Sequence, residues 1–265
     1  MDCTSPSFDP TAGDLPAEAD ARVETVRNDL RREPAGDDIA ALARRLEGAG
    51  PLEVMAQAVA AHRGRIAAVS SFGTESVVLL HMLAQVDPSV PVLFLDTGHL
   101  FTETLDYRDA LIARLGLTDV RTFRPDEALR AARDPDNDLW ASDTDACCDL
   151  RKVEPLGRAL APFDAWINGR KRYQAATRAA IPFVEQDDGR VKYNPLAALG
   201  PEEIAAWMTA HDLPQHPLQH FGFSSIGCMP CTSRAKPGED ARAGRWRGQA
   251  KTECGIHVRK DSPTM

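Results

Sequence analysis

The segment Arg65–Ala84 reads RIAAVSSFGTESVVLLHMLA, and its pattern indicates the fold class of the chain. Arg65–Ser70 is a short apolar run typical of a buried strand, and Ser76–Ala84 has the length and apolar content of a helix. The turn between them, Ser71–Ser76, is rich in hydroxyl groups and contains a glycine. A buried strand that leads directly into a helix is the first half of a unit whose strands run parallel.

The same alternation continues toward the C-terminus. Val90–Asp96 (VPVLFLD) predicts a second buried strand, followed by a helix that ends near Leu115. Further strands are expected at Val120–Phe123, Ala165–Asn168 and Val191–Tyr193, and further helices at Ile39–Glu47, Leu52–His62, Cys148–Leu160 and Pro201–Ala210. We therefore expect a doubly wound α/β domain with a parallel sheet over residues 39–220.

The two ends of the chain differ from this middle part. Residues 1–38 carry ten acidic and four basic side chains and are expected to form a poorly ordered acidic extension. Residues 221–265 carry eight basic and four acidic side chains together with three of the six cysteines, and we expect them to form a tail outside the sheet. A basic tail on a chain of net charge −8 predicts an anion site within the molecule.

Composition also argues against several classes of protein. A formal net charge of −8 argues against nucleic-acid binding, which needs a basic surface. The longest apolar runs, Ser76–Leu83 and Val90–Leu95, are too short to span a bilayer. The first ten residues, MDCTSPSFDP, lack the basic and apolar regions of a signal peptide. We therefore expect a cytoplasmic enzyme with neither a nucleic-acid nor a membrane partner.

The cysteines fall into two pairs and two single residues. Cys147 and Cys148 are adjacent, and a disulfide between them would strain the peptide; Cys228-Met-Pro-Cys231 has the spacing that lets two thiolates face one metal centre. In a cytosolic chain, metal or redox chemistry is a better interpretation of such spacing than disulfides. The two pairs together supply four soft ligands, which suit zinc or an iron–sulfur cluster.

Of the two single cysteines, Cys254 has the more reactive setting. It lies in Lys251–His257 (KTECGIH), where basic neighbours favour the thiolate, so it is a candidate nucleophile. Cys3 lies in the acidic extension and is interpreted as incidental.

Three loops follow the carboxyl ends of predicted strands, where α/β sheets bind ligands. Ser70–Ser76 (SSFGTES) offers hydroxyl groups and helix N–H groups to an anion, and Leu95–His99 (LDTGH) offers a carboxylate and loop backbone to a ribose or adenine. A capped strand–helix turn is the structural alternative for both. The third loop, Trp166–Gln174, carries the cations Arg170, Lys171 and Arg172, which either meet an anion or form a solvated face.

Taken in order, these motifs resemble the assimilatory sulfonucleotide reductases, in particular the iron–sulfur branch that reduces adenylyl sulfate (APS). The resemblance covers Arg65 to His257, with SSFGTES similar to the family's PP-loop and LDTGH to its second nucleotide loop. The other matching segments are Cys147–Pro155 (CCDLRKVEP), Gly227–Thr232 (GCMPCT), Pro237–Trp246 (PGEDARAGRW) and Lys251–His257. The resemblance implies an adenine nucleotide alpha-hydrolase-like fold of the PP-loop type.

The resemblance implies a thioredoxin-dependent reduction of APS to sulfite and AMP in sulfate assimilation, through an S-sulfonated Cys254. It implies a [4Fe–4S] cluster held by Cys147, Cys148, Cys228 and Cys231. Lys152 and His257 would join Cys254 in catalysis. The implied substrate-binding residues are Ser71, Phe72, Gly73, Thr74, Glu75, Ser76, Asp96, Thr97, Gly98, Gly169, Arg178, Arg242 and Arg245.

Other interpretations stay open at this point. Family members that lack both cysteine pairs use the 3′-phosphorylated substrate, PAPS, without a cluster, so the pairs favour APS, while a PAPS or dual-specificity reductase is the alternative. A more remote alternative is a non-catalytic nucleotide-binding regulator with a structural zinc. The oligomeric state is also open, with a homo-oligomer among the alternatives.

Overall fold

A six-stranded sheet in the order β3-β2-β1-β4-β6-β5 forms the centre of the described chain. The computed structural model describes residues 39–236 and 238–257, so the expectations for residues 1–38, including Cys3, lie outside the described residues. The strands are β1 (Ile66–Val69), β2 (Val92–Leu95), β3 (Val120–Phe123), β4 (Ala165–Ile167), β5 (Val184–Asp187) and β6 (Arg190–Tyr193).

The central strand β1 is parallel to both of its neighbours, β2 and β4. It reads IAAV, and all four residues are buried, as expected for a strand covered on both faces. Ile66 and Ala68 face one apolar core, while Ala67 and Val69 face a second. β2 is also parallel to β3, and β4 to β6. The predicted α/β fold with a mainly parallel sheet is therefore confirmed.

The edge strand β5 was missing from the expected elements. It runs antiparallel to β6. The two are joined at Asp188 and Gly189, which both have positive φ, 50° and 76°. An Asp-Gly turn of this kind is a strong hairpin signal. The charged residues of β5, which reads VEQD, conceal it in a search for apolar runs.

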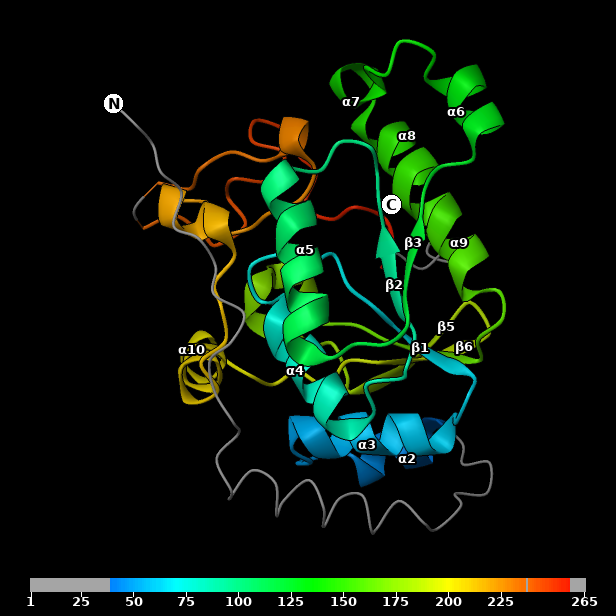
Figure 1. Cartoon of the computed structure of the whole chain (residues 1–265), viewed down its shortest axis with the longest axis vertical. Helices are drawn as coiled ribbons and strands as arrows, with labels where there is room; N and C mark the ends of the chain where they lie inside the picture. The colour runs from blue at the N-terminus through cyan, green and yellow to red at the C-terminus, as the bar shows by residue number, and fades with distance from the viewer. Residues whose placement is uncertain (1–38, 237, 258–265) are drawn as a thin grey trace.

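Helices cover both faces of the sheet, as Figure 1 shows. On one face lie α3 (Pro51–Ala61), α4 (Ser76–Val86) and α5 (Thr102–Leu115), whose buried side chains include Met55, Leu80 and Leu111. Also on this side are α2 (Ile39–Arg45) and α10 (Pro201–Ala210). The opposite face is covered by α9 (Glu154–Leu160).

The predicted helix Cys148–Leu160 is divided in the structure. α8 (Thr144–Cys148) passes into a π-helical turn, η1 (Asp149–Val153), and then into α9. π-helical turns are rare in proteins, and those that occur are frequently found at functional sites. Two short helices before it, α6 (Glu127–Arg133) and α7 (Leu139–Ser142), were not expected, and neither buries a residue.

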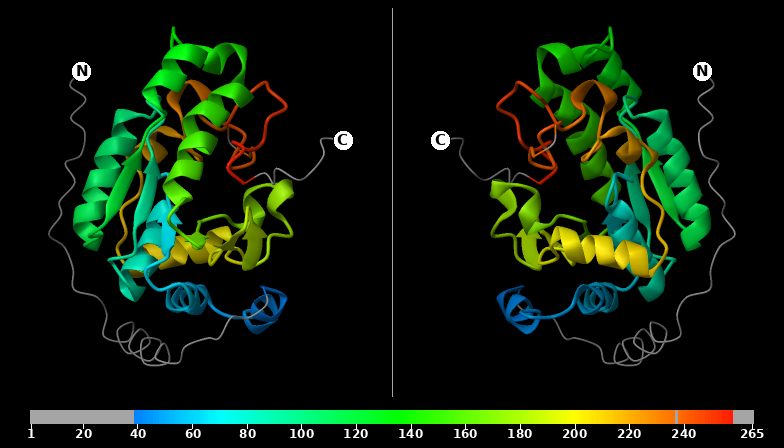
Figure 2. Two further views of the ribbon diagram at one scale, coloured as in Figure 1. Left: turned by 90° about the vertical axis from the view of Figure 1, so that its right-hand side faces the viewer. Right: turned by 90° about the vertical axis from the view of Figure 1, so that its left-hand side faces the viewer.

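The C-terminal segment from residue 221 adds no strand to the sheet in its described part. It contains the 3₁₀ turn η5 (Met229–Cys231) and two isolated bridges, Leu100 with Cys228 and Thr232 with Arg245. Figure 2 shows this segment, in orange and red, beside the helices that include α8. The remaining 3₁₀ turns are η2 (Arg172–Gln174), η3 (Ala176–Arg178) and η4 (Pro217–Phe221). No helix in the described ranges is long and apolar enough to cross a membrane.

Phe72 provides a test of this packing. Its side chain is fully buried, and its ring meets that of Phe94 edge-on at 5.4 Å between centroids. Phe72→Ala should lower the free energy of unfolding in urea by about 3–5 kcal/mol, because it leaves a cavity in the core. The control, Phe221→Ala, removes a ring that is 60% exposed and should change it by less than about 0.5 kcal/mol. Equal losses in the two variants would contradict this placement.

Candidate functional site

A cavity of about 220 Å³ lies at the carboxyl ends of β1, β2 and β4. The loops after these strands form one wall, and the C-terminal segment forms another. The site residues expected from the sequence that line it are Ser71, Gly73, Thr74, Glu75, Ser76, Thr97, Lys152, Gly169, Arg178, Cys228, Arg242, Arg245, Cys254 and His257. The structure thus brings residues of both candidate nucleotide loops, the candidate nucleophile Cys254 and the expected cations to one place.

Three expected substrate-binding residues lie outside this lining. Phe72 points into the core. The carboxylate of Asp96 accepts a hydrogen bond from the Gly98 N–H at 3.0 Å and pairs with Arg124 at 2.9 Å, so it stabilises its own loop. Gly98 has a φ of 74°, the left-handed conformation that favours glycine.

The first loop is held by contacts on both sides. The Phe72 N–H donates to the hydroxyl of Ser70 at 3.2 Å. The Thr74 hydroxyl donates to the Ser224 carbonyl oxygen at 3.4 Å, which ties the loop to the C-terminal segment. α4 begins directly after this loop, so the positive end of its helix dipole lies at the cavity, where an anion is favoured.

Glu75 has its carboxylate committed to the protein. It accepts from the Tyr173 hydroxyl at 2.5 Å and from Gln174 Nε2 at 2.9 Å, and it pairs with Lys171 Nζ at 3.0 Å. Burial raises the pKa of this carboxyl, but Lys171, Tyr173 and Gln174 outweigh burial, and the pKa is lowered. The carboxylate therefore fixes the first loop to the loop after β4.

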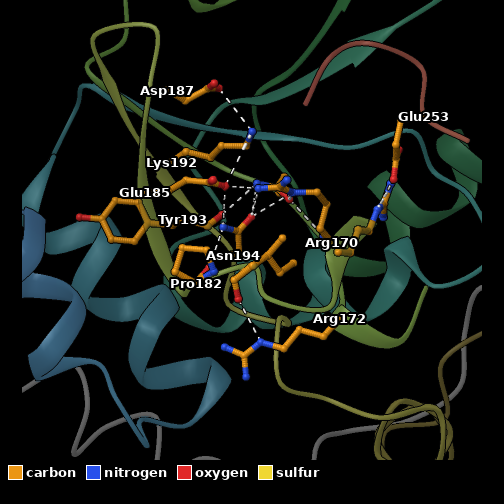
Figure 3. A network of polar contacts seen from close by, with 12 residues as sticks. Arg170, Arg172, Pro182, Glu185, Asp187, Lys192, Tyr193, Asn194 and Glu253 are labelled. Carbon is orange, nitrogen blue, oxygen red and sulfur yellow. Dashed lines mark hydrogen bonds and ion pairs between the residues drawn. The ribbon is translucent and has the colours of Figure 1, made fainter. Parts of the chain in front are cut away.

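The other two cations of the loop after β4 are also engaged, as Figure 3 shows. Arg170 pairs with Glu185 and donates from Nη2 to Asn194 Oδ1 at 3.0 Å. Arg172 donates to the Ile181 carbonyl oxygen at 3.0 Å. Arg170 and Lys171 thus have carboxylate partners, while Arg172 contacts a backbone carbonyl oxygen and the ring of Phe183.

The four cysteines of the two sequence pairs, Cys147–Cys148 and Cys228–Cys231, lie close together beside the cavity. Cys147, Cys148 and Cys228 are buried, Cys231 is partly exposed, and all are free thiols. Burial and the neighbouring thiols Cys148, Cys228 and Cys231 raise the pKa of Cys147 to about 11. Within the described ranges, no group of three or more metal-binding side chains is arranged to hold a single ion.

Two polar groups contact these thiols. The Thr97 hydroxyl lies 3.2 Å from Cys228 Sγ, and Lys152 Nζ lies 3.9 Å from Cys148 Sγ. Burial lowers the pKa of Lys152, but the thiols of Cys228, Cys254 and Cys148 raise it, and the net direction is upward. Lys152 therefore stays charged between the cysteine group and the cavity.

The Arg245 side chain packs directly against Gly227, and both residues line the cavity. A Cβ atom on Gly227 would overlap the Arg245 guanidinium, so only glycine leaves room for it. The Arg245 guanidinium also lies 4.6 Å from the ring centroid of Trp246. Its Nε has no hydrogen-bond partner among the described residues.

His257 lines the cavity, and its ring stacks on Trp166. Its ring is parallel to that of Trp166, with 5.8 Å between centroids, and Lys192 Nζ lies 4.6 Å from the same Trp166 centroid. Burial and then the charges of Lys192, Arg170, Arg178 and Arg242 lower the pKa of His257 well below its usual value. The imidazole is therefore neutral at physiological pH.

Arg178 and Arg242 both contact Glu253, the residue before Cys254. Arg178 donates from Nε and Nη2 to the Glu253 carboxylate at 2.6 and 2.7 Å. Arg242 Nη2 lies 3.5 Å from the same carboxylate and donates to the Thr252 carbonyl oxygen at 2.9 Å. These two cations are thus partnered by the C-terminal segment itself.

The sequence interpretation missed several residues around the cavity. Gln174 and Trp246 line it, and Glu253 pairs with Arg178, which also lines it. Gln174 and Glu253 stand inside segments already singled out, Trp166–Gln174 and Lys251–His257, so those segments were the available signal. Their pairing could not be predicted, since Arg178 and Glu253 are 75 residues apart in the chain.

Arg151 connects the cysteine-bearing helix to the second loop. Its Nη1 donates to the Thr97 carbonyl oxygen at 2.8 Å, and its Nη2 bonds to the carboxylate of Asp134 and to Asn137 Oδ1. The side chains of Arg151 and Asp134 are only 3% and 1% exposed. This pair therefore holds two parts of the site in register.

Comparison with known proteins gives a consistent result. Residues 65–234 match the phosphoadenosine phosphosulfate reductase domain family. A relative from Mesorhizobium japonicum, named adenosine 5′-phosphosulfate reductase, is 53% identical over 229 residues, which cover 84% of this chain and 90% of the relative. A relative from Gloeobacter violaceus, named phosphoadenosine 5′-phosphosulfate reductase, is 42% identical over 227 residues, which cover 82% and 92%.

The solved structures include a similar fold. The crystal structure of phosphoadenylyl-sulfate (PAPS) reductase from Candida auris, in a phosphate complex, matches with a TM-score of 0.65 at 28% identity. The match covers 76% of this chain and 100% of that chain. The sequence and structural matches point to the same family.

The Arg151–Asp134 pair leads to a test of stability. Asp134→Asn should lower the free energy of unfolding in urea by about 3 kcal/mol or more, because it leaves the buried Arg151 charge without its counterion. Asp119→Asn is the matched control, since Asp119 and Arg121 form an exposed pair worth about 0–1 kcal/mol. Similar small losses in both variants would show that the buried pair contributes little.

Proposed function

The chain belongs to the phosphoadenosine phosphosulfate reductase family, and from this premise we propose that it reduces adenosine 5′-phosphosulfate (APS) to sulfite and AMP in sulfate assimilation. The observation that carries the proposal is the cavity. It is lined by Cys254, by the cations Lys152 and Arg245, and by the two loops that follow β1 and β2. A thiol, cations and a nucleotide site together suit a nucleophilic attack on an anionic sulfur.

In the proposed complex, the strand-end loops bind the nucleotide and the cations bind the phosphosulfate. The positive end of the α4 helix dipole favours the α-phosphate. Lys152 and Arg245 line the same cavity and are the cations proposed to bind the phosphosulfate. Arginine suits this role because its planar donors match oxyanions.

The proposed first step is attack by the Cys254 thiolate on the sulfur of APS. A bond forms between the two sulfurs, the bond from sulfur to the phosphate oxygen breaks, and AMP leaves with the electron pair. Lys152 and Arg245 neutralise the charge that develops on the leaving oxygen. His257 lines the same cavity, and because its pKa is lowered its imidazole stays neutral and is a weak base. In the proposed step Cys254 therefore reacts as a thiolate already formed, and His257 contributes an uncharged polar group beside it.

The proposed second step needs an external dithiol of the thioredoxin type. A thiolate of that protein attacks Cys254 Sγ and releases sulfite, leaving a mixed disulfide; its second thiolate then frees Cys254. The two electrons thus come from the dithiol. The five described cysteines are free thiols, as expected in a reducing compartment, which supports the proposed cytoplasmic location.

We propose that Cys147, Cys148, Cys228 and Cys231 hold a [4Fe–4S] cluster. Their thiols are buried or partly buried, and they are close enough to raise one another's pKa, as a set of soft ligands would be. When bound, such a cluster supplies a rigid anionic centre beside the site. Lys152 stands between this cysteine group and the cavity and so links the two.

The preference for APS over PAPS has support in the loop after β4. A 3′-phosphate needs unpaired cations, and Arg170, Lys171 and Arg172 are the cations nearest in sequence to this strand end. All three are engaged by protein groups: Glu185, Glu75 and the Ile181 carbonyl oxygen. A 3′-phosphate would therefore have to compete with Glu185 and Glu75 for Arg170 and Lys171, which supports APS as the preferred substrate.

The mechanism predicts a trapped intermediate. APS added to the anaerobic protein without any thiol should release about one AMP per site and then stop. Intact-mass analysis should show one added sulfonate, and digestion should place it on the Cys254 peptide. Reduced thioredoxin should discharge it as sulfite. Cys254→Ser should bind AMP but form no adduct, because a serine hydroxyl is a far poorer nucleophile. Sulfite release by the serine variant would end this mechanism, and faster turnover of PAPS in a parallel assay would make PAPS the substrate.

The cluster proposal predicts the effect of removing a ligand. Replacement of any one of the four ligands by serine should lower bound iron, acid-labile sulfide and APS reduction together, because thiolate ligands stabilise the cluster. The variants are Cys147→Ser, Cys148→Ser, Cys228→Ser and Cys231→Ser. Cys3→Ser is the control and should retain all three. A colourless protein with zinc in place of iron would refute the cluster, and full iron in two of the variants would remove those residues from the ligand set.

A further inference from the structure

We propose that Glu253 is a positioning residue, whose carboxylate latches the C-terminal segment to Arg178 and Arg242 and so holds Cys254 at the cavity. The inference rests on the proposed function in one respect, namely that Cys254 is the nucleophile. It differs from the expectation that Arg178 and Arg242 serve the substrate, because here both cations contact Glu253.

Arg178 makes the closest contacts of this latch. Arg178 uses Nε and Nη2 for the Glu253 carboxylate and Nη1 for Gln174 Oε1, at 2.6, 2.7 and 2.7 Å. The side chains of Arg178 and Glu253 are only 9% and 14% exposed. A bidentate, desolvated pair of this kind is far stronger than a surface ion pair. Figure 3 shows Glu253 reaching the loop region from the C-terminal segment.

The segment around Cys254 has little else to fix its backbone. Residues 250–257 form no helix or strand, and none of their N–H groups donates a hydrogen bond to another described residue. Side chains hold them instead: Arg242 donates to the Thr252 carbonyl oxygen at 2.9 Å and Lys251 to the Thr144 carbonyl oxygen at 3.0 Å. Ile256 packs against the apolar core that includes residues of α9, and His257 stacks on Trp166. Glu253 is the residue adjacent to the thiol, so its contacts set the position of Cys254 most directly.

The charges support a latch that is closed near neutral pH. Burial raises the pKa of Glu253, but the hydrogen bonds and charges of Arg178 and then Arg242 outweigh burial, and the pKa is lowered. The carboxylate is therefore ionised while the segment is closed. Opening would separate it from both guanidinium groups, so a large reductant reaches Cys254 only after these bonds break.

Access to Cys254 can be measured independently of turnover. The holoenzyme is treated anaerobically with N-ethylmaleimide or with a maleimide that carries a long polyethylene glycol chain, and labelling is counted on the Cys254 peptide. Both reagents react through the same maleimide group, so a change in the thiolate fraction alters both labelling rates equally. The ratio of labelling by the large reagent to labelling by the small one therefore reports access alone. Glu253→Gln should raise this ratio by about tenfold, the factor expected when a charge-assisted hydrogen bond is lost.

Two further variants make the test specific. Glu239→Gln breaks the exposed Glu239–Arg247 pair in the same segment and should leave the ratio unchanged. Glu253→Asp keeps the charge on a shorter side chain and should give an intermediate ratio; it also decides the question if Glu253→Gln does not fold. If Glu253 served only folding, its replacement would lower the affinity for AMP and the rate of AMP release together. A positioning role predicts unchanged AMP affinity, with AMP release from APS in a single turnover slowed about tenfold.

The two proposals can fail separately. A wild-type ratio in both Glu253 variants would overturn the latch, even if the wild-type enzyme reduces APS. A wild-type enzyme that releases no AMP from APS would overturn the proposed function, while the labelling ratio would still decide whether Glu253 holds the segment closed.

Discussion

Parallel pairing of β1 with β2 on one side and with β4 on the other brings the carboxyl ends of these strands to one edge of the sheet. Each strand therefore delivers its following loop to the same edge, and these loops form a wall of the cavity. The pairing is possible because β1 consists of small and medium apolar residues that pack against a core on each face. The C-terminal segment, which has no strand of its own in the described part, then closes over an edge that the sheet has already built.

Charge compensation is the second organising feature. Several cations that the sequence offers as anion ligands are paired with carboxylates of the protein: Lys171 with Glu75, Arg170 with Glu185, and Arg178 with Glu253. A buried cation costs free energy unless a counterion is placed with good geometry, so such pairing is expected. Lys152 and Arg245 differ, because they line the cavity without a carboxylate partner among the described residues. The positive charge available to a ligand in the cavity is therefore smaller than the number of basic residues suggests, and it is concentrated at Lys152 and Arg245.

The sequence was sufficient for features that depend on local pattern. Short apolar runs predicted β1, β2 and β4, because strands buried on both faces read as continuous apolar stretches. β3 (VRTF) and β6 (RVKY) were also expected, although polar residues interrupt them. β5 was missed because its residues are charged, although its Asp188–Gly189 turn was visible. The side-chain direction of Phe72 and the pairing of Arg178 with Glu253 depend on tertiary packing, which neither spacing nor composition contains.

Gly227 has a consequence for how variation in this chain is interpreted. The Arg245 guanidinium occupies the space that a side chain at position 227 would need. Any replacement of Gly227 would thus displace the guanidinium of an arginine 18 positions away, so a change at 227 alters the position of Arg245 although its codon is intact. In a mutational scan, the two positions should show epistasis: once the arginine is shortened, a small residue at 227 becomes tolerable. A position without a side chain would then appear as a functional site, although it contributes only empty space.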